Sequence, residues 1–208
     1  KPTFKIENDW QLIELKDSEL EIIDGDRGIN YPKHQEFKEA GYCVFLNTKN
    51  VLKNGFNFNT VIFITKEKDS LLRKGKLKRN DIVLTTRGTI GNVAINDIQI
   101  PYDHIRINSG MLIFRPDIRY FFPKYIFYLF QTDYIQNKFK KISSGSAQPQ
   151  LPIRNLKFIK IPCPSLKIQK NIVAQIEKEQ KIINANKELI IIFENKIKDK
   201  IAEVWGEQ

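Results

Sequence analysis

The chain has 208 residues, of which 41% are hydrophobic and 28% charged, a composition typical of globular proteins and unlike that of disordered chains. Its 34 Lys and Arg residues outnumber 24 Asp and Glu residues, and this formal net charge of +10 favours a polyanionic partner, nucleic acid before an anionic membrane. No run of about 18 uncharged apolar residues occurs and no signal peptide is visible, so we expect neither a membrane span nor a membrane partner.

The few cysteine and histidine residues exclude two further classes of protein. Cys43 and Cys163 lie far apart, as do His34 and His104, and neither pair has the spacing of a disulfide framework or a zinc site. We therefore expect free thiols in a reducing cytoplasm, no metal site and no cofactor. Because the only Met is Met111, we interpret the chain as a segment of a longer polypeptide.

The first notable segment is a loop rich in glycine, residues 24–33. Its two glycines, Gly25 and Gly28, would allow the backbone to approach a ligand closely. Arg27 and Lys33 are suited to phosphates, and Tyr31 to stacking or hydrogen bonding. The alternative, equally weighted on the sequence alone, is a tight turn in which Arg27 pairs with Asp26.

A β-type run at residues 61–65 precedes the densest run of basic residues in the chain. Seven cations lie within the next 14 positions: Lys66, Lys68, Arg73, Lys74, Lys76, Lys78 and Arg79. They are suited to DNA phosphates, but a solvated, lysine-rich surface hairpin is equally consistent with the pattern, because lysine supplies charge without fixed geometry.

A second β-type run, residues 81–85, leads into a loop that carries Arg87 between threonines and glycines. Arg87 has no acidic neighbour, so an ion pair within the loop does not explain it. We predict that Arg87 and Thr89 contact the ligand, since arginine reads guanine bidentately in the major groove of DNA.

The segment 103–110 is predicted to present Arg106 and Asn108 outward from a strand, just before a further β-type run at 111–114. Asparagine is suited to reading adenine, although a strand-edge asparagine that caps a bulge is more common.

A helix is predicted over residues 121–141, where Pro123 suits the first turn and apolar residues recur about every 3.6 positions. Its basic end, which also complements the helix dipole, continues into a loop of Ser, Gly and Gln residues. In this loop Ser144, Ser146 and Gln148 are candidates for contacts to DNA. A β-type run at 158–161 completes the segment, and the mixture of strands with a segregated helix predicts an α+β domain over residues 1–164.

Residues 165–208 differ from the rest in charge and in period. They carry 8 basic and 7 acidic residues, against 26 and 17 before them, so the positive surplus belongs to the first segment. An apolar residue recurs every seven positions, at Ile176, Ile183, Ile190, Ile197 and Val204. This repeat predicts one long coiled-coil-forming helix whose apolar seam needs a partner helix. A helix folded back across its own domain is the alternative, and Ser165 is the expected N-cap.

Motifs of catalysis are absent from the sequence. It contains no phosphate-binding GxxxxGK[ST] or GxGxxG motif, no GxSxG elbow, and no Asp/Asn-Pro-Pro-aromatic tetrapeptide such as amino-methyltransferases use. Asp24 and Asp26 are close together but form no carboxylate cluster of the kind that a two-metal nuclease needs. We therefore expect a binding module with no catalytic residues.

Several of these segments, in this order, resemble the target recognition domain of type I restriction–modification specificity subunits. The resemblance is carried by Gly25-Asp26-Arg27-Gly28, Tyr31-Pro32, Phe45-Leu46-Asn47-Thr48, Gly75-Lys76-Leu77, residues 81–92, Arg106-Ile107-Asn108-Ser109-Gly110, residues 143–152, and Pro162-Cys163-Pro164 with the helix after it. Each motif alone is loose, but their order covers nearly the whole chain.

The resemblance implies a mixed-sheet DNA target recognition domain followed by a spacer helix. Such a domain reads one half of a bipartite site on double-stranded DNA and is not itself catalytic. Its helix pairs with another and positions an adenine methyltransferase, as a subunit or a fused domain, while a restriction motor–nuclease subunit joins for cleavage. Because a complete specificity subunit usually has two recognition domains, the resemblance further implies a second recognition domain or a self-dimer formed through the C-terminal helix.

Two other functions remain open on the sequence. One is a catalytic DNA methyltransferase or nuclease fragment with unfamiliar residues. The other is an RNA-binding adaptor with a coiled-coil arm, although the aromatic residues lie mostly within apolar runs, which favours a core over a stacking surface.

Overall fold

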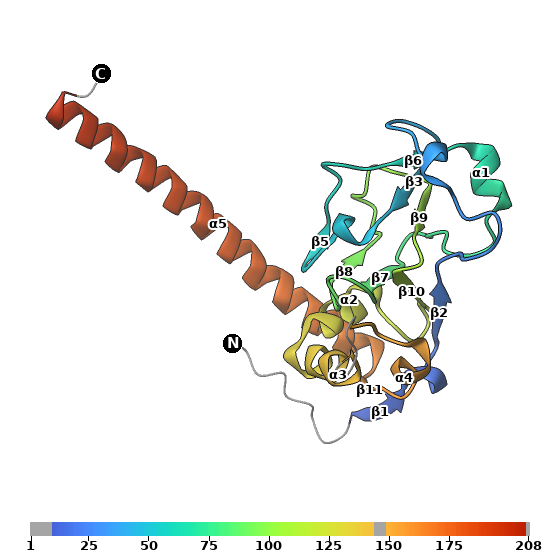
Figure 1. Cartoon of the computed structure of the whole chain (residues 1–208). Coiled ribbons are helices and arrows are strands. Elements are labelled where there is room, and N and C mark those ends of the chain that lie inside the picture. Colours follow the sequence, from blue (N-terminus) through green and yellow to red (C-terminus); the bar gives the residue numbers. More distant parts are fainter. Residues whose placement is uncertain (1–9, 144–148, 207–208) are drawn as a thin grey trace. The chain divides into compact units, whose positions relative to one another are not determined.

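The computed structural model of the chain describes residues 10–143 and 149–206. It divides into two compact units, the first ending at Gln169 and the second beginning at Lys170 (Figure 1). The strands are β1 (Gln11–Glu14), β2 (Leu20–Asp24), β3 (Cys43–Leu46), β4 (Val51–Leu52), β5 (Gly55–Phe56), β6 (Phe63–Ile64), β7 (Ile82–Thr85), β8 (Val93–Ile95), β9 (Ile105–Ile107), β10 (Met111–Pro116) and β11 (Lys160–Cys163). The α-helices are α1 (Lys66–Leu71), α2 (Pro123–Gln131), α3 (Asp133–Ser143), α4 (Ile153–Leu156) and α5 (Leu166–Trp205). Short 3-10 helices occupy Leu15–Asp17, His34–Glu36 and Thr48–Asn50.

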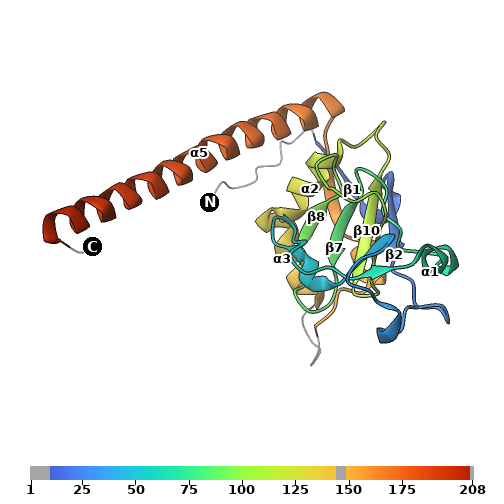
Figure 2. The same ribbon diagram turned by 90° about the horizontal axis from the view of Figure 1, so that it is seen from above.

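The first unit is built around an antiparallel sheet in the order β2-β10-β7-β8, whose strands lie side by side in Figure 2. Strand β10 is central, and its Ile113 pairs with Ile23 on one side and with Val83 on the other. Successive side chains of a strand point to opposite faces of the sheet. Both faces are covered, so four consecutive residues from Met111 are buried and the strand reads as a continuous apolar run.

Helices α2 and α3 cover one face of this sheet. Phe114 of β10 meets Phe130 of α2 edge to face at a centroid distance of 4.9 Å, and Phe130 meets Phe139 of α3 at 5.8 Å. Such aromatic pairs add to the free energy that burial of their area already supplies. These two helices thereby form the layer that covers one face of the four-stranded sheet.

A second, smaller sheet covers the other face, in the order β6-β3-β9. Strands β3 and β9 are parallel, with Val44 opposite Ile105 and Leu46 opposite Ile107. These four residues share one buried cluster with residues of β7 and β10. The expected α+β class with mixed sheets and a long C-terminal helix is therefore confirmed.

Two predictions of secondary structure from the sequence need correction. The helix predicted over 121–141 is two helices, because Thr132 is extended between them: its Oγ1 donates to Leu129 O at 2.7 Å and accepts from Ile135 N at 3.4 Å. The basic run contains no hairpin, since its first part forms α1 with Thr65 as N-cap. Pro123 does lie in the first turn of α2, as expected.

Helix α5 has 40 residues, which at about 1.5 Å each make a rod of roughly 60 Å. Ile168 N donates to Ser165 Oγ at 3.5 Å, the contact expected of an N-cap. At the other end Gly206 has a φ of 68°, a left-handed conformation that terminates helices. Gln169, in the first turn, belongs to the first unit, where its amide contacts Tyr120 O and Pro164 O.

Candidate nucleic-acid interface

The turn of residues 108–110, between β9 and β10, joins the ends of strands from both sheets. Asn108 N donates to Leu46 O at the end of β3, at 3.1 Å. Gly110 O accepts from Thr86 N at 2.8 Å and from Arg87 N at 3.2 Å, just beyond β7. The turn is closed internally by Gly110 N, which donates to Asn108 Oδ1 at 2.9 Å. The side chain of Asn108, a predicted contact to DNA, therefore stabilises this turn.

Arg87 lies beside this turn, at the start of a loop whose backbone is held by hydrogen bonds. Thr85 Oγ1 accepts from Asn92 N at 3.0 Å across the loop, and Gly88 and Gly91 adopt positive φ angles of 68° and 88°. Arg87 and Thr89 are exposed, and no ion pair among the described residues involves Arg87. An unpaired guanidinium on a rigid loop is suited to bidentate recognition of a base or phosphate.

Arg27 approaches the same turn from the end of β2. Its Nη2 lies 3.0 Å from Asp24 Oδ2 and donates to Ser109 O at 3.2 Å. The alternative of a pair with Asp26 is wrong, because Asp26 instead accepts from the backbone amide of Gly28 at 2.7 Å. The structure therefore brings Arg27, Arg87 and Asn108 to one turn, although they come from three separate strand ends.

The other two predicted residues of the first loop lie elsewhere. Tyr31 is half-buried, and its ring meets that of Phe45 edge to face at 5.7 Å. Lys33 is exposed and precedes a 3-10 helix, where its amide donates to Glu36 Oε2 at 2.7 Å. Tyr31 thus helps to anchor the loop on the core.

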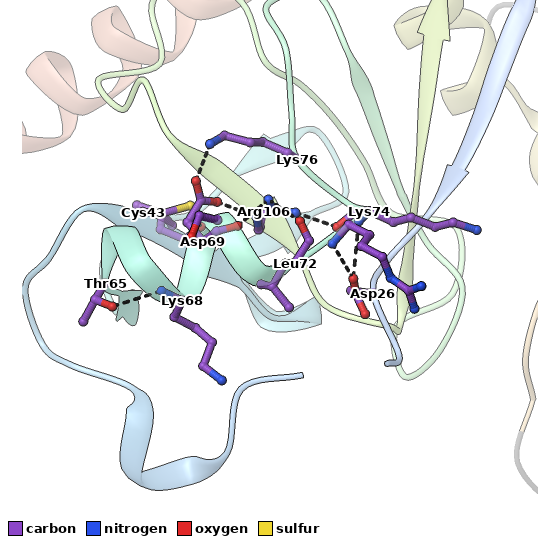
Figure 3. A network of polar contacts seen from close by, with 12 residues as sticks. Asp26, Cys43, Thr65, Lys68, Asp69, Leu72, Lys74, Lys76 and Arg106 are labelled. Atoms are coloured by element: carbon purple, nitrogen blue, oxygen red, sulfur yellow. Dashed lines mark hydrogen bonds and ion pairs between the residues drawn. The ribbon is translucent and has the colours of Figure 1, made fainter. Parts of the chain in front are cut away.

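The expectation that Arg106 points outward is wrong. Its residue is only 4% exposed, and its guanidinium bonds Asp69 Oδ1 at 2.5 Å, Lys74 O at 2.7 Å and Leu72 O at 3.0 Å (Figure 3). Strand β9 has three buried residues because the core lies on one side and the α1 segment on the other. Alternation along a strand predicts an exposed face only where one side of the sheet meets solvent.

The buried pair of Arg106 and Asp69 is electrostatically balanced. Burial raises the pKa of Asp69, but hydrogen bonds from Lys76 and Arg106 outweigh it and hold that pKa below its usual value. Asp69 therefore stays ionised, as a buried carboxylate beside two cations should. Cys43, close to this pair, has its pKa raised by burial to about 12 and is an inert thiol.

Ser144, Ser146 and Gln148 lie outside the described residues. The residues that follow lie beside the Arg87 loop. Gln150 pairs with Arg87 in an isolated antiparallel β-bridge, and Leu151 N donates to Thr86 O at 2.9 Å. The start of the Arg87 loop and the segment after position 148 are thus neighbours in the fold.

Two residues of this region were not among the predicted contacts. Thr48 lies close to both Gly88 and Gly110. A Cβ on Gly110 would lie 3.0 Å from Thr48 Cγ2, and a Cβ on Gly88 would lie 3.5 Å from Thr48 Oγ1. Ile29, beside Arg27, is 99% exposed at the tip of its loop. Sequence gave no signal for Ile29, because an isoleucine is expected in a core.

Within residues 10–143 and 149–206 no cluster of His, Cys, Asp or Glu is arranged to hold a metal ion. None of the helices in that part of the chain is both long and apolar enough to cross a membrane. Cys43 and Cys163 are free, the first buried and the second half-buried.

Residues 7–195 match the family described as "Type I restriction modification DNA specificity domain". The chain belongs to this family. Among its relatives, the specificity subunit of the type I restriction enzyme MjaVIII from Methanocaldococcus jannaschii is 29% identical over 187 residues, which cover 86% of this chain and 41% of that protein. The EcoBI specificity subunit from Escherichia coli is 27% identical over 116 residues, or 55% of this chain and 23% of the relative.

Solved structures of type I specificity domains share the fold of this chain. A chain from a type I R-M system, studied for complex assembly and conformational transition, has a TM-score of 0.65 at 17% identity and covers 90% of this chain and 42% of its own. The HsdS subunit from Thermoanaerobacter tengcongensis has a TM-score of 0.61 at 18% identity, with coverages of 90% and 41%. This member of the family thus spans about two fifths of the length of its longer-matching relatives.

Proposed function

We propose that residues 1–164 recognise a specific sequence on double-stranded DNA as the non-catalytic specificity module of a type I-like restriction–modification system. The observation that carries this proposal is the meeting of Arg27, Arg87 and Asn108 at one turn of a domain of this family. Phosphate contacts position a protein on DNA, and contacts to base edges specify the sequence. The domain holds nearly all of the positive surplus, and Arg87 is both exposed and fixed at its backbone.

Helix α5 would carry the second part of this function. Its residues with exposed apolar side chains include Ile183, Ile190, Ile197 and Val204, at 47%, 56%, 59% and 66% exposure, on the seven-residue repeat that Ile176 begins. We infer that this seam pairs with another such helix, from a second recognition domain or a second copy of the chain. The paired helices would set the distance between two half-sites and position an adenine methyltransferase and a motor–nuclease subunit in the cytoplasm.

The experiment that tests the proposal is selection of duplexes bound by the chain from a pool with a randomised central segment. Enrichment of one defined half-site, with weaker binding to scrambled duplex, is the expected result. Equal retention of all duplexes would contradict it. Competition by duplex RNA separates the RNA-adaptor alternative, and incubation of the chain with DNA, Mg²⁺ and a methyl donor separates the enzymatic one.

A further inference from the structure

The segment of residues 72–78, between α1 and β7, concentrates exposed cations. Arg73, Lys74 and Lys78 are exposed, and none of them is in an ion pair among the described residues. The segment lines two adjoining hollows. The larger, of about 610 Å³, is lined by residues 73–78 with strand β2 and Arg115, and the smaller, of about 330 Å³, by Arg73 and Lys74 with residues 24–28 of the Arg27 loop.

Three acidic residues also line these hollows, and each is already engaged within the chain. Asp26 accepts from the backbone amides of Gly28, Arg73 and Lys74, and the other two have cationic partners. Asp24 lies 3.0 Å from Arg27 Nη2, and Glu21 lies 3.5 Å from Arg115 Nη1. None of these three carboxylates is in an ion pair with Arg73, Lys74 or Lys78 among the described residues. The charge of Arg73 helps to lower the pKa of Asp26, but no ion pair forms between them, so the three exposed cations can meet an anion from outside the chain.

Two backbone carbonyls of this segment accept hydrogen bonds from the buried side chain of Arg106. Its guanidinium donates to Asp69 O at 2.8 Å, Leu72 O at 3.0 Å and Lys74 O at 2.7 Å, so one buried side chain binds the end of α1 and the start of the basic segment (Figure 3). Five donors in a rigid fork make arginine suited to binding several carbonyls at once.

The backbone amides of the same segment are held by Asp26. Its Oδ2 accepts from Arg73 N at 2.8 Å and from Lys74 N at 3.3 Å, while its Oδ1 accepts from Gly28 N. Burial raises the pKa of Asp26, but the hydrogen bonds from these three amides outweigh burial and hold that pKa below its usual value, so the carboxylate is ionised at neutral pH. Asp26 thus connects the basic segment to the loop that carries Arg27.

Glycine contacts bring this segment close to the turn of residues 108–110. A Cβ on Gly75, whose φ is 83°, would lie 3.2 Å from Gly25 Cα, and a Cβ on Gly25 would lie 2.2 Å from Asn108 O. A side chain at Gly25 would therefore force these backbones apart. The basic segment, the Arg27 loop and the turn form one closely packed unit.

We propose that Arg73, Lys74 and Lys78 bind the phosphates of the DNA backbone next to the base-reading residues, and that Asp26 and Arg106 are the positioning residues that hold them there. This inference rests on the proposed recognition of DNA and extends it to a named phosphate-binding segment. A solvated lysine run needs no fixed backbone, whereas here both the carbonyls and the amides of the run are bound by buried side chains. Fixing the backbone in advance lowers the entropic cost of binding.

The first experiment removes charge from the segment. Lys74→Ala with Lys78→Ala should lower the slope of log affinity against log salt by about two, because each lost phosphate contact changes it by about one. Cognate and scrambled duplexes should lose affinity equally, since phosphates carry no sequence information. The matched control, Lys181→Ala with Lys187→Ala on α5, removes the same charge and should leave the slope unchanged.

A slope that is the same in the test and control pairs would overturn the inference while DNA recognition stands. Absence of DNA binding by the unaltered chain would instead overturn the proposed function. Because Lys74 and Lys78 are exposed, their removal leaves the core intact, and the result does not depend on any buried substitution.

The second experiment tests Asp26 by the sign of its effect. Asp26→Asn removes a negative charge beside the cations, so charge alone predicts tighter binding of DNA. We expect weaker binding, because asparagine has only one acceptor oxygen. Its amide nitrogen would face either the Arg73 and Lys74 amides or the Gly28 amide, so the connection between the basic segment and the Arg27 loop would be lost. Asp17→Asn, an exposed residue of the same unit, is the matched control and should bind at least as tightly as the unaltered chain. An Asp26→Asn chain that is folded by circular dichroism and binds DNA as tightly as the control would contradict the positioning role.

Discussion

The two units of this chain use the same apolar residues in opposite ways. Ile113, in the central strand of the first unit, is 0% exposed, whereas Ile190, in the second unit, is 56% exposed. Strand β10 is covered on both faces, by helices on one and a second sheet on the other. From Lys178 to Ile201 every residue of α5 is exposed, so its apolar side chains have no cover within their own unit.

This difference teaches that apolar content by itself does not indicate a core. Burying one large aliphatic side chain contributes about 1.5–3 kcal/mol, and the first unit gains this free energy when the chain folds. The exposed isoleucines of α5 would gain it only on association. Stability is therefore expected to depend on the first unit, and assembly on the second.

The same substitution placed in each unit gives the largest expected contrast. Ile113→Asp buries an unpaired charge in the central sheet and should cost more than about 4 kcal/mol, enough to unfold the domain. Ile183→Asp with Ile190→Asp should leave the domain folded and abolish pairing of the helix. Circular dichroism reports the first effect, and sedimentation equilibrium of the chain the second. If the helix variant associated like the unaltered chain, the seam would not be the pairing surface.

Two arginines allow a finer contrast within the first unit. Arg106→Ala leaves Asp69 as a buried carboxylate with only Lys76 beside it, and loss of a buried partner typically costs about 3–5 kcal/mol of stability. Arg87→Ala should change the urea midpoint very little, because Arg87 is exposed and forms no ion pair among the described residues. Equal midpoints for the two variants would mean that the Arg106 network contributes little to folding.

These arginines also show where the sequence is informative and where it is not. β7 and β10 were predictable because continuous apolar runs mark strands covered on both faces, and α5 because its period persists over many turns. The burial of Arg106 was not predictable, since Asp69 lies 37 positions away and only the tertiary fold brings them together. The break between α2 and α3 did have a local signal, because Thr132 and Asp133 are residue types that begin helices.

The candidate site was predictable to a similar degree. The resemblance and the glycine-flanked Arg87 pointed to loops that lie close together in the fold, but not to the turn that joins them. That turn depends on two hydrogen bonds to other strand ends: Asn108 N donates to Leu46 O, and Gly110 O accepts from Thr86 N. The Asp26 contacts depend likewise on a segment 47 positions away. Contacts of this range leave no periodic trace in a single sequence.

Arg87, whose loss should barely affect stability, should matter for the recognition of DNA. Arg87→Ala is expected to weaken binding to the selected half-site by about 1–3 kcal/mol and to weaken binding to scrambled duplex less, because a bidentate base contact is lost. Titration of both duplexes at one salt concentration measures the difference. An equal loss on the two duplexes would assign Arg87 to phosphate rather than to a base edge.

Ile29 tests the contrast between the units most directly, because it is an isoleucine of the first unit that is exposed like those of the second. Its loop is held on both sides, by Arg27 on Ser109 O and by Asn30 Nδ2 on Leu71 O at 3.3 Å, so the side chain is presented without being packed. If Arg27 reads a base, as we propose, an apolar side chain beside it is suited to the methyl group of thymine. We expect Ile29→Ala to weaken half-site binding by about 1 kcal/mol, the free energy gained by burying one or two CH₂ groups. The urea midpoint should not change. Ile98→Ala, at a residue 86% exposed in another loop, is the matched control for the loss of a surface isoleucine. If both variants bound the half-site equally well, Ile29 would be an ordinary exposed residue, and association through apolar side chains would belong to the helix alone.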